Sequence, residues 1–347
     1  MRSFSNKVKT QDAVSAIRVG VSVGLPLCAL YAAGRLDIAA YAAFGSLTSL
    51  YGHSESAQRR VETQMVVAAG IVATIAAAAI YSAAQGPVWL LGIMLAGVVA
   101  GAGTLGAVMG WVPRGEIFFI LVLLVIAGVP LKPEHVPLAI ATGAGGAGFA
   151  VLLTLLGPKG ALRVRPMIRR VRARAMIGSA TLDVTQHLIV IVAAVAGVLC
   201  AWLLALALHI GHPFWSPITV AALMPALTSA DITRRTVQLM LGTITGVCFA
   251  ALLFSAEPGV FALIVLIALC QAVAELFVAR NYAIALIFIS PLAIGMSNLG
   301  RNLPWDPLLA ERLVEAGLGS AVALVTIVIG RAVLAKAAPL ARMDSAS

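Results

Sequence analysis

The sequence predicts an all-α polytopic membrane protein with about twelve transmembrane helices in two parallel six-helix repeats. Composition, the order of the apolar segments and the distribution of basic residues predict this fold class. Of the 347 residues, 61% are hydrophobic and 11% are charged. Soluble globular domains carry about 25% charged residues, so the composition excludes a water-soluble globule.

Twelve apolar segments follow one another in two groups of six. The first group covers residues 14–33, 37–51, 61–83, 87–110, 116–130 and 136–157. The second group covers residues 185–210, 213–228, 236–254, 258–278, 282–297 and 308–333. A straight helix needs about 20 apolar residues to cross a membrane. The segments at 37–51 and 213–228 are shorter, so we expect half-helices or broken helices that line a central cavity.

The two groups match each other along the chain, which predicts an internal duplication. The matched residues are Tyr41 with Trp215, Arg59-Arg60 with Arg234-Arg235, Arg114 with Arg280, Pro137 with Pro307, and Gly157 with Gly330. We therefore expect residues 1–158 to form the first six-span repeat, residues 159–184 a basic cytoplasmic linker, and residues 185–347 the second repeat. Because each repeat has an even number of spans, both should have the same orientation.

Basic residues predict the orientation of the chain. With a cytoplasmic N-terminus, the residues that fall outside are four of the 24 Lys and Arg, namely Arg35, Lys132, Arg301 and Arg312. Cytoplasmic loops carry an excess of Lys and Arg. We therefore expect a multi-pass protein of the plasma membrane, the bacterial inner membrane, with both termini cytoplasmic. The basic N-terminal stretch shows no small-residue cleavage site and is expected to be retained.

The linker is strongly basic and has two interpretations. Its basic side chains are Lys159, Arg163, Arg165, Arg169, Arg170, Arg172 and Arg174. They could form an arm that collects anions or binds nucleic acid, or a helix that lies on anionic lipid headgroups. The flanking spans favour the second interpretation, so the expected partners of residues 159–174 are lipid headgroups. No nucleic-acid partner is expected.

Motifs of enzymes and cofactor sites are missing from the sequence. It contains no P-loop, no HExxH, no paired Cys/His spacing and no GxSxG elbow, so we expect no enzyme, no cofactor and no metal site. The glycine run at residues 143–148 lies inside an apolar segment and predicts close helix packing. Without a nucleotide site, transport would be driven by an ion gradient or a partner, or would be passive.

One stretch resembles a known family. Residues 214–246 read FWSPITVAALMPALTSADITRRTVQLMLGTITG. The stretch resembles the signature of the fusaric acid resistance-like family of aromatic acid exporters. The matching residues are Trp215, Pro217, Thr219, Arg234, Arg235, Gln238, Gly242, Thr243 and Gly246. The resemblance implies efflux of aromatic carboxylates or other organic anions, and plant malate channels share a related half. The first-half copy is degenerate, and apart from the basic linker we expect none of the cytoplasmic domains that larger members add.

Two arginine pairs are the candidate substrate-binding cations. Arg234 and Arg235 begin a helix, where a carboxylate meets positive charge and unpaired backbone amides. Arg59 and Arg60 occupy the matched position in the first half and would form a second wall. The alternative is that both pairs only follow the positive-inside rule.

Aromatic residues of the short segments are further candidates for substrate binding. Tyr41 and Trp215, with the nearby Thr219, would line the cavity and stack on an aromatic substrate. The alternative is that they belong to the aromatic belt at the membrane interface.

Three acidic residues in or beside apolar segments are candidates for proton coupling, because intramembrane acids are costly and mark functional sites. They are Glu275, Glu116 and Glu315. The alternative is local pairing, with Arg280, Arg114 and Arg312 respectively. We expect Glu275 to be the most important, since it has the longest apolar flanks.

These observations leave three function classes. The favoured one is an efflux carrier for aromatic carboxylates or other organic anions, coupled to protons. A passive organic-anion channel and a non-transport membrane protein, such as a scaffold or a lipid-modifying enzyme, are the alternatives. The sequence fixes neither the substrate nor the oligomeric state, and a homo-oligomer stays open.

Overall fold

The computed structural model describes residues 10–53, 55–111, 115–156, 164–229, 232–299 and 303–344. Within these residues the chain is helical, with no β-strand. The helices of the first part are α1 (Thr10–Ala32), α2 (Ala39–Ser46), α3 (Ala57–Ala83), α4 (Val88–Met109), α5 (Ile117–Ala127) and α6 (Val136–Leu155). They are followed by α7 (Val164–Thr181), α8 (Val184–Ala207), α9 (Trp215–Leu223), α10 (Ile232–Phe254), α11 (Val260–Val278), α12 (Tyr282–Asn298) and α13 (Trp305–Asp344). Four short 3₁₀ turns are η1 (Leu36–Ile38), η2 (Leu47–Leu50), η3 (Pro133–His135) and η4 (Met224–Leu227).

Eight helices of the described chain are long and apolar enough to cross a membrane, namely α1, α3, α4, α6, α8, α10, α11 and α13. Four apolar stretches are shorter: Leu36–Leu50, Ile117–Ala127, Trp215–Leu227 and Tyr282–Asn298. The prediction of a multi-pass helical membrane protein is therefore confirmed. Of the twelve expected crossings, the structure supports eight by length, and the shortness of the first and third of these stretches agrees with the sequence analysis.

The short stretch Trp215–Leu227 breaks at a proline. Helix α9 ends at Leu223 and continues as the 3₁₀ turn η4, which has a proline in its first residues. That residue is Pro225, which has no backbone N–H to donate, so the regular α-helical ladder is interrupted there. In the first half, α2 changes to the turn η2 at Leu47 without a proline. Both breaks lie among buried residues, where irregular backbone is shielded from lipid.

The same pairs of neighbours recur in the two parts of the bundle. Helix α2 packs against α6, as α9 packs against α13. Helix α3 contacts α5 and α6, as α10 contacts α12 and α13. Between the parts, α1 contacts α11 and α4 contacts α8. A duplicated six-helix unit would produce this pattern.

Glycines allow the closest helix approaches, as the glycine run predicts. A Cβ atom added to Gly146 of α6 would lie 2.1 Å from the carbonyl oxygen of Ala42 in α2. A Cβ atom added to Gly319 of α13 would lie 2.5 Å from the carbonyl oxygen of Ser216 in α9. Since Tyr41 matches Trp215 in the sequence, these two approaches involve matched positions. Small residues that bring backbones together are typical of membrane helix packing.

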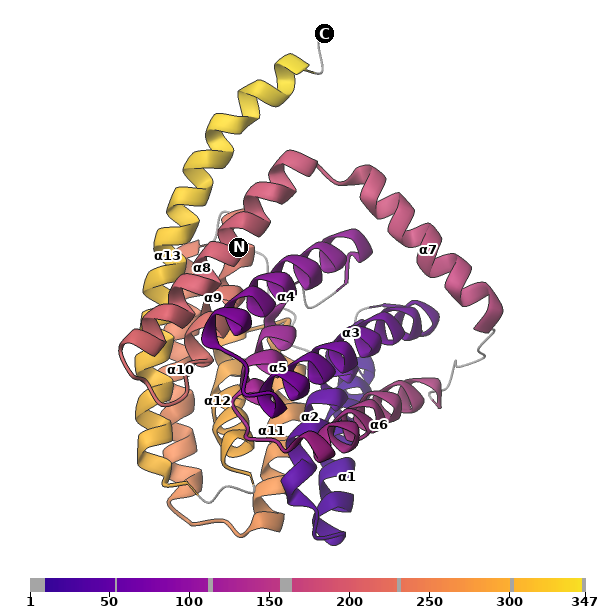
Figure 1. The fold of residues 1–347 in the computed structure, drawn as a ribbon, viewed down its shortest axis with the longest axis vertical. Helices are drawn as coiled ribbons and strands as arrows, with labels where there is room; N and C mark the ends of the chain where they lie inside the picture. Colours follow the sequence, from indigo (N-terminus) through magenta and orange to yellow (C-terminus); the bar gives the residue numbers. More distant parts are fainter. Residues whose placement is uncertain are drawn as a thin grey trace.

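Helix α7 joins the two parts and lies along the outside of the bundle, between the end of α6 and the start of α8 (Figure 1). One face of it is bound to the protein. Arg170 Nε lies 2.7 Å from Glu62 Oε1, and Arg174 Nη2 lies 2.7 Å from Glu55 Oε1. These two linker arginines are therefore neutralised by protein acids, which the sequence analysis did not anticipate.

Candidate functional site

A buried polar cluster lies where α9 meets α13. Arg312 and Glu315 are three residues apart on α13, and their exposed fractions are 5% and 0%. The guanidinium carbon of Arg312 lies 4.5 Å from the centre of the Trp215 ring. The backbone N–H of Ser216 donates a 2.8 Å hydrogen bond to Glu315 Oε2, and the Ser216 hydroxyl donates to the Glu315 carbonyl oxygen at 3.0 Å. The first turn of α9 thus binds a carboxylate, as helix N-termini favour.

Arg312 and Glu315 interact electrostatically, as the local-pairing alternative expects, but no hydrogen bond joins them. Ser216 binds one oxygen of Glu315, while the other oxygen has no hydrogen-bond partner among the described residues. The Nε and Nη1 atoms of Arg312 also have no partner in the described part of the chain. Arg312 lies near the start of α13, the end at which it was expected, and it is buried there among other side chains.

A second arginine approaches this cluster from α10. Arg235 Nε donates a 2.9 Å hydrogen bond to the carbonyl oxygen of Ala222 in α9. Its guanidinium carbon lies 5.1 Å from the centre of the Tyr282 ring. Tyr282, at the start of α12, interacts electrostatically with both Arg235 and Arg312. Arg234, which precedes Arg235 in the sequence, is exposed.

The matched arginine pair in the first half is divided in the same way. Arg60 donates hydrogen bonds to the carbonyl oxygens of Gly52, His53 and Glu55 at 3.0, 2.9 and 3.1 Å. Arg59 is exposed. In each pair, the second arginine therefore binds backbone carbonyls in or just after the short helical stretch, and the first arginine is exposed. Burial, followed by the positive charge of Arg60, lowers the pKa of His53 below its usual value.

Glu275 has different neighbours from those expected. It is partly buried on α11 and interacts electrostatically with Arg18 of α1 and Arg60 of α3. The alternative of a local pair with Arg280 is wrong, because Arg280 binds the Asp12 carboxylate and donates to the Leu276 carbonyl oxygen. Packing of α1 against α11 brings these groups together.

The remaining predicted site residues are buried. Glu116 is 6% exposed and borders Gly103 of α4, while its considered partner Arg114 lies outside the described residues. Tyr41 and Trp215 are 2% and 4% exposed, so the protein interior surrounds them and the interfacial-belt alternative is not supported. The Thr219 hydroxyl donates to the Trp215 carbonyl oxygen at 2.9 Å within α9.

The structure therefore brings some predicted residues together and separates others. Trp215 and Glu315 share one cluster, which Arg235 joins through Tyr282. Arg60 and Glu275 belong to a second group of charged residues, which also contains Arg18. Arg312 and Tyr282 were not proposed as site residues, although an arginine inside an apolar segment was a usable signal.

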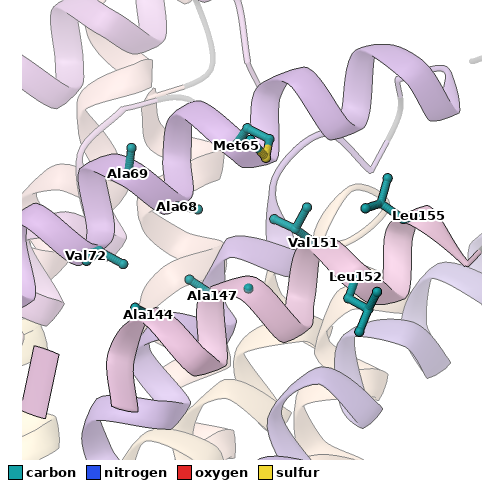
Figure 2. A pocket seen from close by; sticks show the side chains of 10 residues that line it. Met65, Ala68, Ala69, Val72, Ala144, Ala147, Val151, Leu152 and Leu155 are labelled. Carbon is teal, nitrogen blue, oxygen red and sulfur yellow. The ribbon is translucent and has the colours of Figure 1, made fainter. Parts of the chain in front are cut away.

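An apolar groove of about 590 Å³ lies elsewhere, between α3 and α6 (Figure 2). Met65, Ala68 and Val72 of α3 face Ala147 and Val151 of α6 across it. None of the residues that line this groove is charged. It therefore offers no cation to a carboxylate.

Comparisons with known proteins match parts of the chain. Residues 198–326 match the family described as fusaric acid resistance protein-like. A segment of 122 residues is 28% identical to the uncharacterized membrane protein YvaC of Bacillus subtilis (strain 168). The matched segment covers 35% of this chain and 19% of that protein, so less than a fifth of the relative is represented. No solved structure matches the chain.

The matched region contains Trp215, Arg235, Tyr282, Arg312 and Glu315, so the buried cluster lies wholly inside it. The resemblance drawn from the sequence is confirmed over these residues. The chain is therefore a multi-pass membrane protein whose residues 198–326 are similar to the fusaric acid resistance protein-like family.

Proposed function

We propose that the chain is a transporter that exports aromatic carboxylates or other organic anions and is coupled to protons. The observation that carries this proposal is Arg312, whose guanidinium is buried inside an apolar helical bundle against the Trp215 ring. A carboxylate that leaves water needs charge-assisted hydrogen bonds to replace its hydration. Ionisable groups inside membrane proteins usually serve a transported ion or a proton pathway.

The proposed architecture has two six-helix repeats, residues 1–158 and 185–347, joined by the linker at 159–184. The recurring neighbour pairs and the matched approaches of Gly146 and Gly319 support the duplication. In this proposal the short stretches that contain α2 and α9 are broken helices of the interior. The distribution of basic residues supports cytoplasmic termini in the bacterial inner membrane.

The exposed face of α7 supports a contact with anionic lipid headgroups. Its apolar side chains Ile168, Met176 and Ile177 are more than half exposed, and the cations Arg169 and Arg172 are exposed beside them. An amphipathic helix that exposes both apolar and basic side chains suits the membrane interface. Arg170 and Arg174 would meanwhile keep α7 attached to the protein.

The two members of each arginine pair have different proposed roles in substrate binding. Arg59 and Arg234 are exposed, so each would make the first contact with an anion at the cytoplasmic mouth. Arg60 and Arg235 bind backbone carbonyls in or just after the short helical stretches, which would form the wall of the path. Tyr41, Trp215 and Thr219 would line its interior.

Orientation gives a direct prediction. Single cysteines are introduced at Ser3, Ser179 and Ser345 after the four native cysteines are replaced. Each should be protected from a membrane-impermeant thiol reagent in intact cells and should react with it once the cells are permeabilised. The reason is that basic residues concentrate on the cytoplasmic side of the proposed spans. Labelling is measured in intact cells with membrane-impermeant maleimide. Labelling at Ser179 from outside would overturn the two-repeat arrangement.

Counterflow in proteoliposomes distinguishes the proposed carrier from the alternatives. Vesicles loaded with unlabelled benzoate should accumulate labelled benzoate transiently, with saturable exchange. A passive channel would give anion current without this exchange, and a scaffold or enzyme would give neither. A proton gradient should change the extent of accumulation if transport is proton-coupled.

Proton coupling gives a prediction for Glu275. Glu275→Gln should leave the protein folded and weaken gradient-driven benzoate transport, because an amide of similar shape cannot load and release a proton. Glu62→Gln is a suitable control, since Glu62 is paired with Arg170 of α7. If Glu275 only balances the charges of Arg18 and Arg60, the Gln variant should instead lose thermal stability and keep its transport rate per folded molecule. Glu116 and Glu315 are the other proposed proton-coupling residues.

A further inference from the structure

We propose that Arg312 is the anchor for the carboxylate of the transported organic acid, in a buried site formed with Trp215, Ser216, Tyr282 and Glu315. This inference rests on the proposed function and names the group that recognises the substrate. Its basis is a guanidinium that is 5% exposed and has two donor atoms without a partner among the described residues. A second polar atom of the same cluster, Oε1 of Glu315, is in the same state.

The energetic argument starts from the cost of burying these groups. A charged guanidinium in an apolar interior is costly unless its N–H groups are hydrogen-bonded and its charge is balanced. Arg312 receives a cation–π contact from Trp215, which compensates part of that cost. The unpaired Nε and Nη1 atoms leave hydrogen-bonding capacity that a carboxylate is suited to satisfy.

Glu315 lies one turn away and balances part of the charge of Arg312, but it makes no hydrogen bond to the guanidinium. Its carboxylate is held by the backbone N–H of Ser216 at the start of α9. The Ser216 hydroxyl bonds to the backbone of the same glutamate, which fixes α13 against this turn. The cluster thus keeps its own acid on α9 and leaves two donor atoms of the guanidinium without a partner.

Packing alone does not require the charged pair. Helix α6, which packs against α2 as α13 packs against α9, contains no charged residue in Val136–Leu155. Its close approach to α2 at Gly146 is even tighter than that of Gly319 to α9. The first half therefore builds the same helix contact without an arginine or a glutamate. Arg312 and Glu315 need an explanation other than the contact itself.

The surroundings indicate the class of substrate. One guanidinium with two unused hydrogen-bond donor atoms matches one carboxylate, and the nearby rings of Trp215 and Tyr282 suit an apolar or aromatic body. Arg235 is already bound to the Ala222 carbonyl and lies over Tyr282, so it is less available to a second carboxylate. The site fits a monocarboxylate with an aromatic or apolar body better than a dicarboxylate.

Binding of labelled benzoate to the purified protein in nanodiscs tests the inference, with benzamide as the neutral analogue. Arg312→Gln should weaken benzoate binding about 10- to 100-fold. Arg312→Lys should recover part of the affinity, since it keeps the charge and loses the bidentate geometry. Unlabelled benzamide should compete poorly for wild-type protein, because it lacks the charge.

Arg331→Gln is the matched control. Arg331 lies on the same helix, and its guanidinium donates to the carbonyl oxygens of Ala226, Leu227 and Ser229. Its loss removes an equal charge and should change benzoate affinity by less than about twofold. A loss of benzoate binding in both variants would indicate a general charge or folding effect and would overturn the assignment of Arg312.

A second measurement decides the matter if Arg312→Gln does not fold. Because Trp215 stacks on Arg312, benzoate should change the tryptophan fluorescence of wild-type protein, and Trp215→Phe should abolish that change. If benzoate binds but the fluorescence change persists in Trp215→Phe, the proposed site is wrong. Transport of benzoate that is independent of Arg312 would refute this inference and leave the proposed function intact. Absence of benzoate binding and transport in wild-type protein would refute both for this substrate class.

Discussion

Gly319→Ala should strongly destabilise the protein, whereas Gly317→Ala on the same helix should not. The added Cβ at residue 319 would lie 2.5 Å from the Ser216 carbonyl oxygen and 2.7 Å from the Thr219 Cβ. At Gly317 the added atom meets nothing within 4 Å. Overpacking of this kind typically costs about 1–3 kcal/mol and occasionally more, and here the obstacle includes backbone. Thermal unfolding of both variants in the same detergent measures the difference.

The first half offers a matched pair of its own. Gly146→Ala should destabilise through contact with the Ala42 carbonyl oxygen at 2.1 Å, while Gly145→Ala meets nothing within 4 Å. Parallel losses for Gly146→Ala and Gly319→Ala would support a duplicated packing motif. Equal stability of Gly146→Ala and Gly145→Ala would contradict the close approach of α2 and α6.

Sequence patterns predicted the features that depend on local composition. Length and hydropathy identified the short stretches around α2 and α9, because a membrane sets the length of a crossing helix. The glycine run at residues 143–148 predicted close packing, and two of its members, Gly143 and Gly146, contact α2. The segments at residues 116–130 and 282–297 are also short, and the helices within them, α5 and α12, have 11 and 17 residues.

Partners across the fold were beyond the reach of sequence spacing. The spacing suggested a local partner for Glu275, but α1 supplies Asp12 to Arg280 and places Arg18 near Glu275. Only the packing of α1 on α11, between distant parts of the chain, explains this exchange. Arg312 was likewise assigned to an outer end from its place in the segment, and its burial depends on how α13 packs on α9.

The arginine pairs give the second prediction with a large effect. Arg60→Gln should lower the free energy of unfolding by about 1.5–3 kcal/mol, because hydrogen bonds from a charged group hold the carbonyl oxygens of Gly52, His53 and Glu55. Arg59→Gln should change stability by no more than about 0.5 kcal/mol, since that side chain is exposed. Chemical denaturation in detergent micelles compares the two variants.

In transport measurements, loss of the exposed arginine of each pair should have the larger effect on uptake per folded molecule. Arg59→Gln and its counterpart Arg234→Gln should reduce benzoate uptake at low ionic strength, and the reduction should shrink in high salt, because exposed charges act through a screened field. Arg60→Gln and Arg235→Gln should reduce the amount of folded protein more than the uptake per folded molecule. If the exposed arginines only set orientation, Arg59→Gln and Arg234→Gln would leave uptake unchanged at every salt concentration. If Arg60 and Arg235 bind the substrate directly, their loss would weaken benzoate affinity in protein of normal stability, and the division within each pair would be wrong.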